Sequence, residues 1–156
     1  MLLLGGATLF LAAQCIRIAP RTNPPIRGDL VASDPVASDL VAPPAVRQVL
    51  RAACYDCHSN ETRWPWYSAV APLSWWIVHH VNEGRRRLNC SEWDAYASDP
   101  DTAAQKLGEI ARFVTNGEMA PWYYRALYPD ARLTAEQRAI VARWAADEAQ
   151  RLTHTH

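Results

Sequence analysis

The stretch CYDCH, residues 54–58, constrains the chain more than any other part of the sequence. Two cysteines stand three positions apart, and a histidine follows the second one directly. Three kinds of site contain such a pattern: half of a zinc site, a redox-active dithiol, and the attachment site of a c-type haem. In a haem site, two thiols one helical turn apart each add to a vinyl group on the porphyrin edge, and the histidine binds the iron.

The remainder of the sequence favours haem over the other two sites. Zinc needs four ligands, usually from a second closely spaced pair, but Cys15 and Cys90 stand alone. A thioredoxin-like dithiol would lie near a βαβ pattern, and the chain has no convincing strand. We therefore predict one covalent haem c per chain, attached through Cys54 and Cys57, with His58 as the proximal iron ligand.

A second axial ligand is expected to be methionine or histidine. Met119 lies in NGEMAPWYY, where a helix-ending Asn-Gly pair precedes it, so it can approach the iron from a loop opposite His58. The alternative is that Met119 only fills a gap in the core, which is common for methionine. His80 is the competing ligand, although a histidine on the apolar helical face of Trp76 and Ile77 is more often a hydrogen-bonded core residue. We predict Met119 as the distal ligand.

Hydrophobic periodicity predicts an all-α fold, a small cytochrome c-like helical bundle around the haem. One helical stripe contains Val46, Val49, Leu50, Ala53 and Cys54. Further helices are expected over 72–84, from Pro100 to the Asn116-Gly117 pair, and from Thr134, where Gln137 completes a capping box. Ser91 is expected to cap a short segment that contains Trp93.

The N-terminal part of the chain differs from this helical region. The apolar run MLLLGGATLFLAAQC is slightly short of the ~20 helical residues that cross a bilayer. We predict an apolar anchor helix or uncleaved signal segment over 1–19. Six prolines between residues 20 and 44 predict a linker, which leaves 45–152 for the haem-binding domain.

The composition argues against one class of partner and indicates which side chains could form the walls of a haem pocket. Sixteen basic and sixteen acidic side chains cancel, which argues against nucleic-acid binding. Seven tryptophans and six tyrosines provide the apolar area that surrounds a flat ligand. Arg63 and the run Arg85–Arg87 could pair with haem propionates or could simply be solvated.

Several stretches together resemble a small bacterial haem-binding domain family built around one C-x-x-C-H. They are RTNPP, CYDCHSNETRWPWYS, APLSWW, LNCSEW and GEMAPW, and the similarity runs from Arg21 to Trp144. The resemblance implies a monohaem module with an N-terminal membrane segment. It carries the thioether role to Cys54 and Cys57, the proximal role to His58 and a distal role to Met119. In this chain Ala120 replaces the first proline of the family's G-E-M-P-P motif, and Cys90 stands where N-F-S-E-W has an aromatic residue.

The resulting expectation is a membrane-tethered monohaem c-type cytochrome that carries single electrons, an electron-transfer protein rather than an enzyme, although the sequence leaves the enzymatic alternative open. It would be anchored in the bacterial inner membrane by a single pass, with the haem domain in the periplasm. Its partners would be redox proteins, and the family's association with dihaem peroxidase-type domains suggests one class of them. The alternatives are a haem peroxidase-like enzyme with an open distal position, and a gas or redox sensor in which Met119 is displaced.

Overall fold

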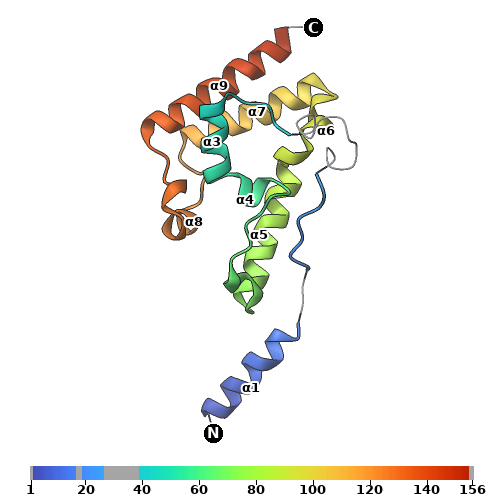
Figure 1. Ribbon diagram of the computed structural model, residues 1–156, viewed down its shortest axis with the longest axis vertical. Helices are drawn as coiled ribbons and strands as arrows, with labels where there is room; N and C mark the ends of the chain where they lie inside the picture. The colour runs from blue at the N-terminus through green and yellow to red at the C-terminus, as the bar shows by residue number, and fades with distance from the viewer. Residues whose placement is uncertain (1, 17–18, 27–38, 155–156) are drawn as a thin grey trace.

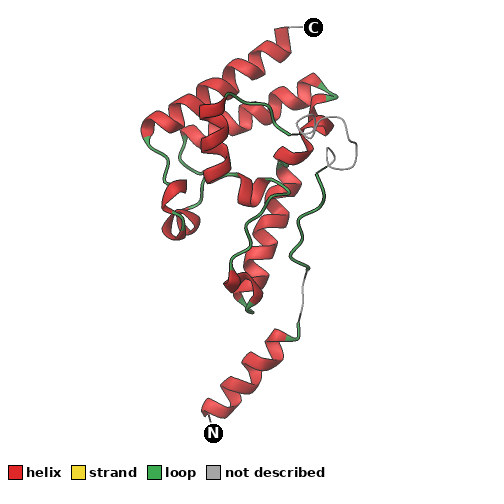
Figure 2. Ribbon diagram, viewed as in Figure 1, coloured by secondary structure: helices red, strands yellow, loops and turns green. Residues whose placement is uncertain are grey.

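The fold is all-α, as the sequence predicts. The structure is a computed structural model that describes residues 2–16, 19–26 and 39–154, and every regular element in these residues is a helix (Figure 2). The α-helices are α1 (Leu2–Gln14), α3 (Pro44–Ala53), α4 (Tyr55–His58), α5 (Leu73–Arg87), α6 (Trp93–Ala97), α7 (Pro100–Thr115), α8 (Trp122–Leu127) and α9 (Ala135–His154). Short 3₁₀ helices are η1 (Trp66–Ala69), η2 (Cys90–Glu92) and η3 (Pro129–Ala131).

Three helices make the main core. α7 and α9 pack along one another, and α3 lies beside them (Figure 1). Leu50, Leu107 and Val141, one from each helix, are almost completely buried. Burial of such a side chain stabilises the fold by about 1.5–3 kcal/mol. The predicted stripe on α3 is confirmed, because Val46, Val49, Leu50 and Ala53 are all buried.

Most helix ends lie where local sequence signals place them. At the start of α9 the Gln137 backbone N–H donates to Thr134 Oγ1 at 3.1 Å, and the Thr134 N–H donates to Gln137 Oε1 at 2.9 Å. This reciprocal pair is a capping box. Two predictions were wrong in detail: α5 continues to Arg87 rather than ending near Gly84, and Asn89, not Ser91, caps the turn before Trp93.

The N-terminal residues touch the domain at defined points. Gln14, at the end of α1, bonds both backbone polar groups of Ala71 at 2.9 and 3.2 Å. Asn23 donates to the Thr62 carbonyl at 2.9 Å and accepts from Arg85 at 2.9 Å. The predicted linker, residues 20–44, therefore contacts the domain at Asn23, whereas its residues 27–38 lie outside the described residues.

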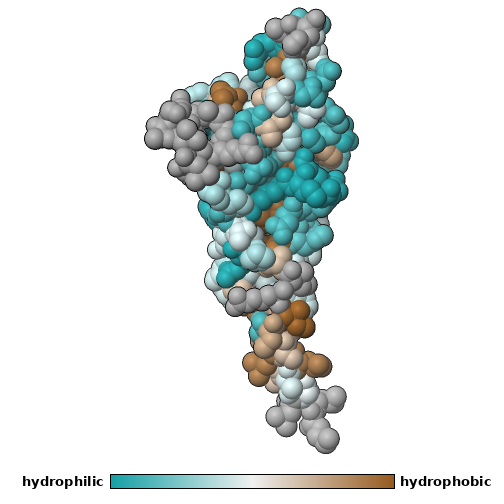
Figure 3. Space-filling view, turned by 90° about the vertical axis from the view of Figure 1, so that its right-hand side faces the viewer, coloured by the Kyte–Doolittle hydropathy of each residue, from teal (hydrophilic) through white to brown (hydrophobic). Residues whose placement is uncertain are grey.

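The segment predicted as an anchor, residues 1–19, contains the short helix α1 (Leu2–Gln14), and the predicted anchor helix itself is not borne out. α1 extends away from the other helices at one end of the molecule, and its surface is hydrophobic while the rest of the visible face is mostly hydrophilic (Figure 3). Leu9 and Leu11 are exposed there. Across the described part of the chain, no helix has both the length and the hydrophobicity needed to cross a bilayer.

Candidate haem site

The C-x-x-C-H residues form a single helical turn directly after α3. The Cys54 N–H donates to the Leu50 carbonyl at 2.8 Å, and the His58 N–H donates to the Cys54 carbonyl at 2.9 Å. Because the buried face of α3 fixes the direction of its last turn, the motif is held against the core. This is the local reason that Cys54 and His58 face the protein interior.

His58 is oriented by the backbone of the segment after α5. Its Nδ1 lies 3.1 Å from the Leu88 carbonyl oxygen. Because a carbonyl can only accept, Nδ1 carries the hydrogen, and Nε2 keeps a lone pair for a metal. A backbone carbonyl on one ring nitrogen is the usual support of a metal-binding histidine. Burial lowers the pKa of His58, which favours the neutral, ligating form.

Gly84 lets α5 approach the motif closely. A Cβ atom added to Gly84 would lie 2.4 Å from the Cys57 carbonyl oxygen and 3.2 Å from Cys57 Cβ. Only glycine therefore permits this contact between α4 and α5. The sequence contained a signal for it, since a glycine in the interior of a helix costs about 1 kcal/mol relative to alanine and needs a packing reason.

The two thiols of the motif are not in a disulfide, and both cysteines are half-buried. Burial raises the pKa of Cys54 to about 12 and that of Cys57 to about 11. Reactive dithiols have lowered thiol pKa values, so these surroundings do not fit a redox-active pair. Within the described residues, no group of three or more His, Cys, Asp or Glu side chains could hold a metal ion, so a zinc site is not supported either.

The turn after α7 brings Met119 back along that helix. The Glu118 N–H donates to the Phe113 carbonyl at 3.1 Å, and the Gly117 N–H donates to the Val114 carbonyl at 3.2 Å. With Gly117 at φ 70°, these two bonds form a Schellman motif, for which glycine at the left-handed position is favoured. The Asn-Gly pair thus ends α7 and places Met119 next to the helix's last turn.

Cys54, His58 and Met119 line one cavity of about 360 Å³. Its apolar walls include Leu50 from α3 and Ile110 from α7. Ligand sites typically have volumes of about 300–1,000 Å³ and mostly apolar walls. The structure therefore brings together three of the four predicted haem-binding residues, including both predicted iron ligands.

Basic side chains also border this cavity. They are Arg87 from α5 and Lys106 and Arg112 from α7. Of the arginines considered from the sequence, only Arg87 lies here. Arg63 instead pairs with Asp56, whereas Lys106 and Arg112 were missed because neither belongs to a motif.

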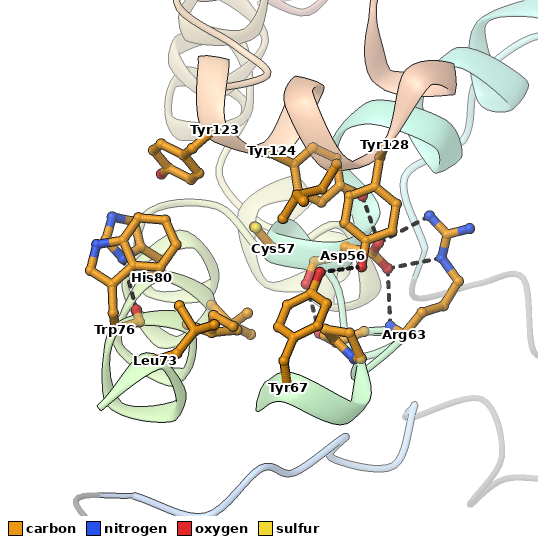
Figure 4. A pocket seen from close by; sticks show the side chains of 15 residues that line it. Asp56, Cys57, Arg63, Tyr67, Leu73, Trp76, His80, Tyr123, Tyr124 and Tyr128 are labelled. Carbon is orange, nitrogen blue, oxygen red and sulfur yellow. Dashed lines mark hydrogen bonds and ion pairs between the residues drawn. The ribbon is translucent and has the colours of Figure 1, made fainter. Parts of the chain in front are cut away.

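The fourth predicted residue, Cys57, borders a different cavity (Figure 4), which shares no lining residue with that of His58 and Met119. His80 lines this second cavity as well, and its Nδ1 lies 2.8 Å from the Trp76 carbonyl oxygen. The structure does not bring His80 to the cavity that contains His58 and Met119.

An ionic cluster behind Cys57 was not foreseen from the sequence. Asp56, 6% exposed, accepts from Arg63 Nε at 3.1 Å and Nη2 at 3.0 Å, and from the Tyr124 hydroxyl at 2.6 Å (Figure 4). Tyr124 belongs to α8, which follows the Met119 loop. The cluster therefore connects the cysteine turn to the segment that carries Met119.

These residues fit a haem. The set consists of an imidazole with a free Nε2, a thioether from a loop and two half-buried thiols. Histidine and methionine are iron ligands of cytochromes c, and the two thiols of C-x-x-C-H are the groups that attach such a haem covalently. The apolar walls suit the porphyrin face. The basic residues suit its propionates, although Lys106 is paired at 3.3 Å with Glu109, which also lines the cavity, and Arg87 is paired at 2.9 Å with Glu83. Nothing in the cavity requires a different group.

The comparison with protein families agrees with this chemistry. A model of a haem-binding domain family matches residues 8–147, nearly the whole chain. No curated protein and no solved structure matches the chain. The residues of the site and the family match both indicate haem. The chain belongs to the haem-binding domain family.

Proposed function

We propose that the protein is a monohaem c-type cytochrome that carries single electrons. In this proposal Cys54 and Cys57 hold the haem covalently, and His58 and Met119 are the axial ligands of its iron. The observation that supports it best is the single cavity lined by His58, with Nε2 free for a ligand, and by Met119. A haem bound there supplies one-electron redox chemistry.

The surrounding residues would set the properties of the iron. The Leu88 carbonyl fixes the imidazole ring plane, because its hydrogen bond leaves one tautomer. Met119 as a ligand raises the reduction potential relative to a second histidine. Leu50 and Ile110 make part of the cavity wall apolar, and an apolar shell that limits access of water to the iron would act in the same direction.

Absorption spectra of three proteins test the ligation. Wild type, Met119→Ala and His80→Ala should be produced in cells with haem-attachment machinery. We expect the weak far-red sulfur-to-iron band in wild type and in His80→Ala, and its loss in Met119→Ala. Persistence of that band in Met119→Ala would remove the methionine from the proposed ligand set.

We also propose that the domain works outside the cytoplasm, attached to the bacterial inner membrane through its N-terminal segment, and exchanges electrons with redox partner proteins. The exposed apolar side chains of α1, such as Leu9 and Leu11, support attachment. Fractionation of cells that express the full chain or a chain without residues 1–19 tests it. The full chain should sediment with membranes and the shortened one should not.

A further inference from the structure

Exposed apolar side chains gather at the end of the domain to which α1 is attached. This end, which we call the tip, consists of η1, the turn after it and the first turn of α5, residues 66–76 (Figure 1). Trp66 is 79% exposed, and Leu73 and Trp76 are 43% and 42% exposed. Because η1 packs against α5, these side chains belong to one surface. An exposed apolar patch of this kind marks a contact with a protein or a membrane.

The tip is also free of acidic side chains. No Asp, Glu, Lys or Arg occurs from residue 64 to residue 82, although such residues make up 21% of the chain. A charged side chain that does contact the tip is Arg21, whose Nη1 donates to Ser68 Oγ at 3.3 Å. A surface with a guanidinium at its margin and no carboxylate in its own sequence attracts anionic lipid headgroups rather than repelling them.

Hydrogen bonds join the tip to the end of α1. The Gln14 side chain bonds the N–H and the carbonyl of Ala71, and the Trp75 indole N–H donates to the Ile16 carbonyl at 2.8 Å. In the proposed attachment α1 enters the membrane, and the chain leaves it before Arg17, because a charge is costly in the bilayer core. The tip is therefore held at the level at which the chain leaves the lipid.

We infer that the tip rests in the headgroup region of the membrane, with the side chains of Trp66, Leu73 and Trp76 among the lipids. Tryptophan is enriched at this level because its ring combines a large apolar face with one N–H donor. The inference rests on the proposed attachment through α1 and adds a second membrane contact, made by the folded domain itself.

A tip in the headgroup region also sets the orientation of the candidate haem site. α5 begins at the tip, and Arg87 and Leu88 at its far end line the cavity of His58 and Met119 (Figure 1). The fifteen residues of α5 rise ~22 Å at ~1.5 Å per residue. The iron would thus be held at the end of α5 remote from the lipid, toward partners in the aqueous phase.

Vesicle binding of the haem-loaded full chain tests this inference. Sucrose-loaded vesicles of phosphatidylethanolamine and phosphatidylglycerol should be titrated into the protein, and the bound fraction measured from the haem band after sedimentation. Trp66→Ser should weaken binding about tenfold. That ratio corresponds to about 1.4 kcal/mol, or to roughly 55 Å² of apolar surface that no longer leaves water. Because the tip adds only this factor, a chain without residues 1–19 should still stay in the soluble fraction.

Trp122→Ser is the matched control for this substitution. Trp122 is 74% exposed, but it belongs to α8, which lies away from α1 (Figure 1). We expect Trp122→Ser to bind vesicles as tightly as wild type. Unchanged haem spectra establish that both variants are folded.

Hydrogen exchange gives a second reading of the same contact. Amides of residues 66–72 should exchange more slowly in the vesicle-bound full chain than in the free one, whereas those of α7 should be unchanged. Equal vesicle binding by Trp66→Ser and wild type, an equal loss in Trp122→Ser, or unaltered exchange at the tip would each overturn the inference. A change of oligomeric state in Trp66→Ser without lipid would instead make the tip a contact between two copies of the chain, and would overturn it as well.

The proposals can fail separately. A full chain that binds vesicles equally well with and without Trp66 overturns only the tip contact. A full chain that does not bind vesicles overturns the proposed attachment together with the tip. Neither result affects the electron-carrier function, which fails if Cys54 and Cys57 carry no haem.

Discussion

The contact between Gly84 and the Cys57 carbonyl gives a sharp prediction about how α5 supports the cysteine turn. In Gly84→Ala the new Cβ would lie 2.4 Å from a backbone oxygen, which cannot rotate away as a side chain does. Overpacking of this kind costs about 1–3 kcal/mol, and a backbone clash belongs at the upper end. The gain in helix propensity offsets about 1 kcal/mol, which leaves a net destabilisation of about 2 kcal/mol.

Gly108→Ala is the matched control for this substitution. Gly108 lies inside α7, and nothing is within 4 Å of its added Cβ. The same change of residue should therefore stabilise the protein by about 0.5–1 kcal/mol. The two variants should differ by about 3 kcal/mol in the free energy of unfolding.

Denaturant titration of the haem-loaded proteins, followed by the haem absorption band and by helical circular dichroism, measures this difference. We also expect a lower yield of haem-loaded protein for Gly84→Ala, because displacement of the Cys57 carbonyl disturbs the turn that presents both thiols. The reasoning is refuted if Gly84→Ala is as stable as Gly108→Ala.

Two further predictions concern Tyr124 and His58. Tyr124→Phe removes a 2.6 Å hydrogen bond to the Asp56 carboxylate and should lower the free energy of unfolding by about 1.5–3 kcal/mol. Tyr123→Phe removes no hydrogen bond within the described residues and should be neutral. Equal unfolding midpoints for the two variants would contradict the importance of the cluster. In haem-free protein, burial lowers the pKa of His58 below its ordinary 6.5, so the unfolded chain takes up a proton that the folded chain resists. Stability should then fall as the pH is lowered through 6.5, and His58→Gln should flatten the profile; a wild-type profile as flat as that of the variant would show that His58 is not the group responsible.

Local features of the fold were predictable because each depends on residues close in sequence. The stripe on α3, the Schellman turn at Gly117 and the capping box of Thr134 and Gln137 are of this kind. The stripe depends only on the spacing of apolar residues along one helix. In the other two features, the groups that bond the free N–H or carbonyl groups at a helix end lie within six residues of one another.

The support of the candidate site was not predictable in the same way. The Leu88 carbonyl that orients His58 lies 30 positions away in sequence, and Tyr124 lies 68 positions from Asp56. No periodicity or spacing links such pairs, because only the packing of separate helices brings them together. The division of the two cysteines between two cavities has the same origin, since one wall is made by α7 and the other by α5 and α8.

The mass of one peptide tests the central claim most directly. Protein purified from its native cell should be digested, and the peptide that contains residues 54–58 analysed by mass spectrometry. The account predicts that this peptide carries one haem through two thioether bonds, and that Cys54→Ala and Cys57→Ala each leave a single attachment. A native peptide with two unmodified thiols would contradict it.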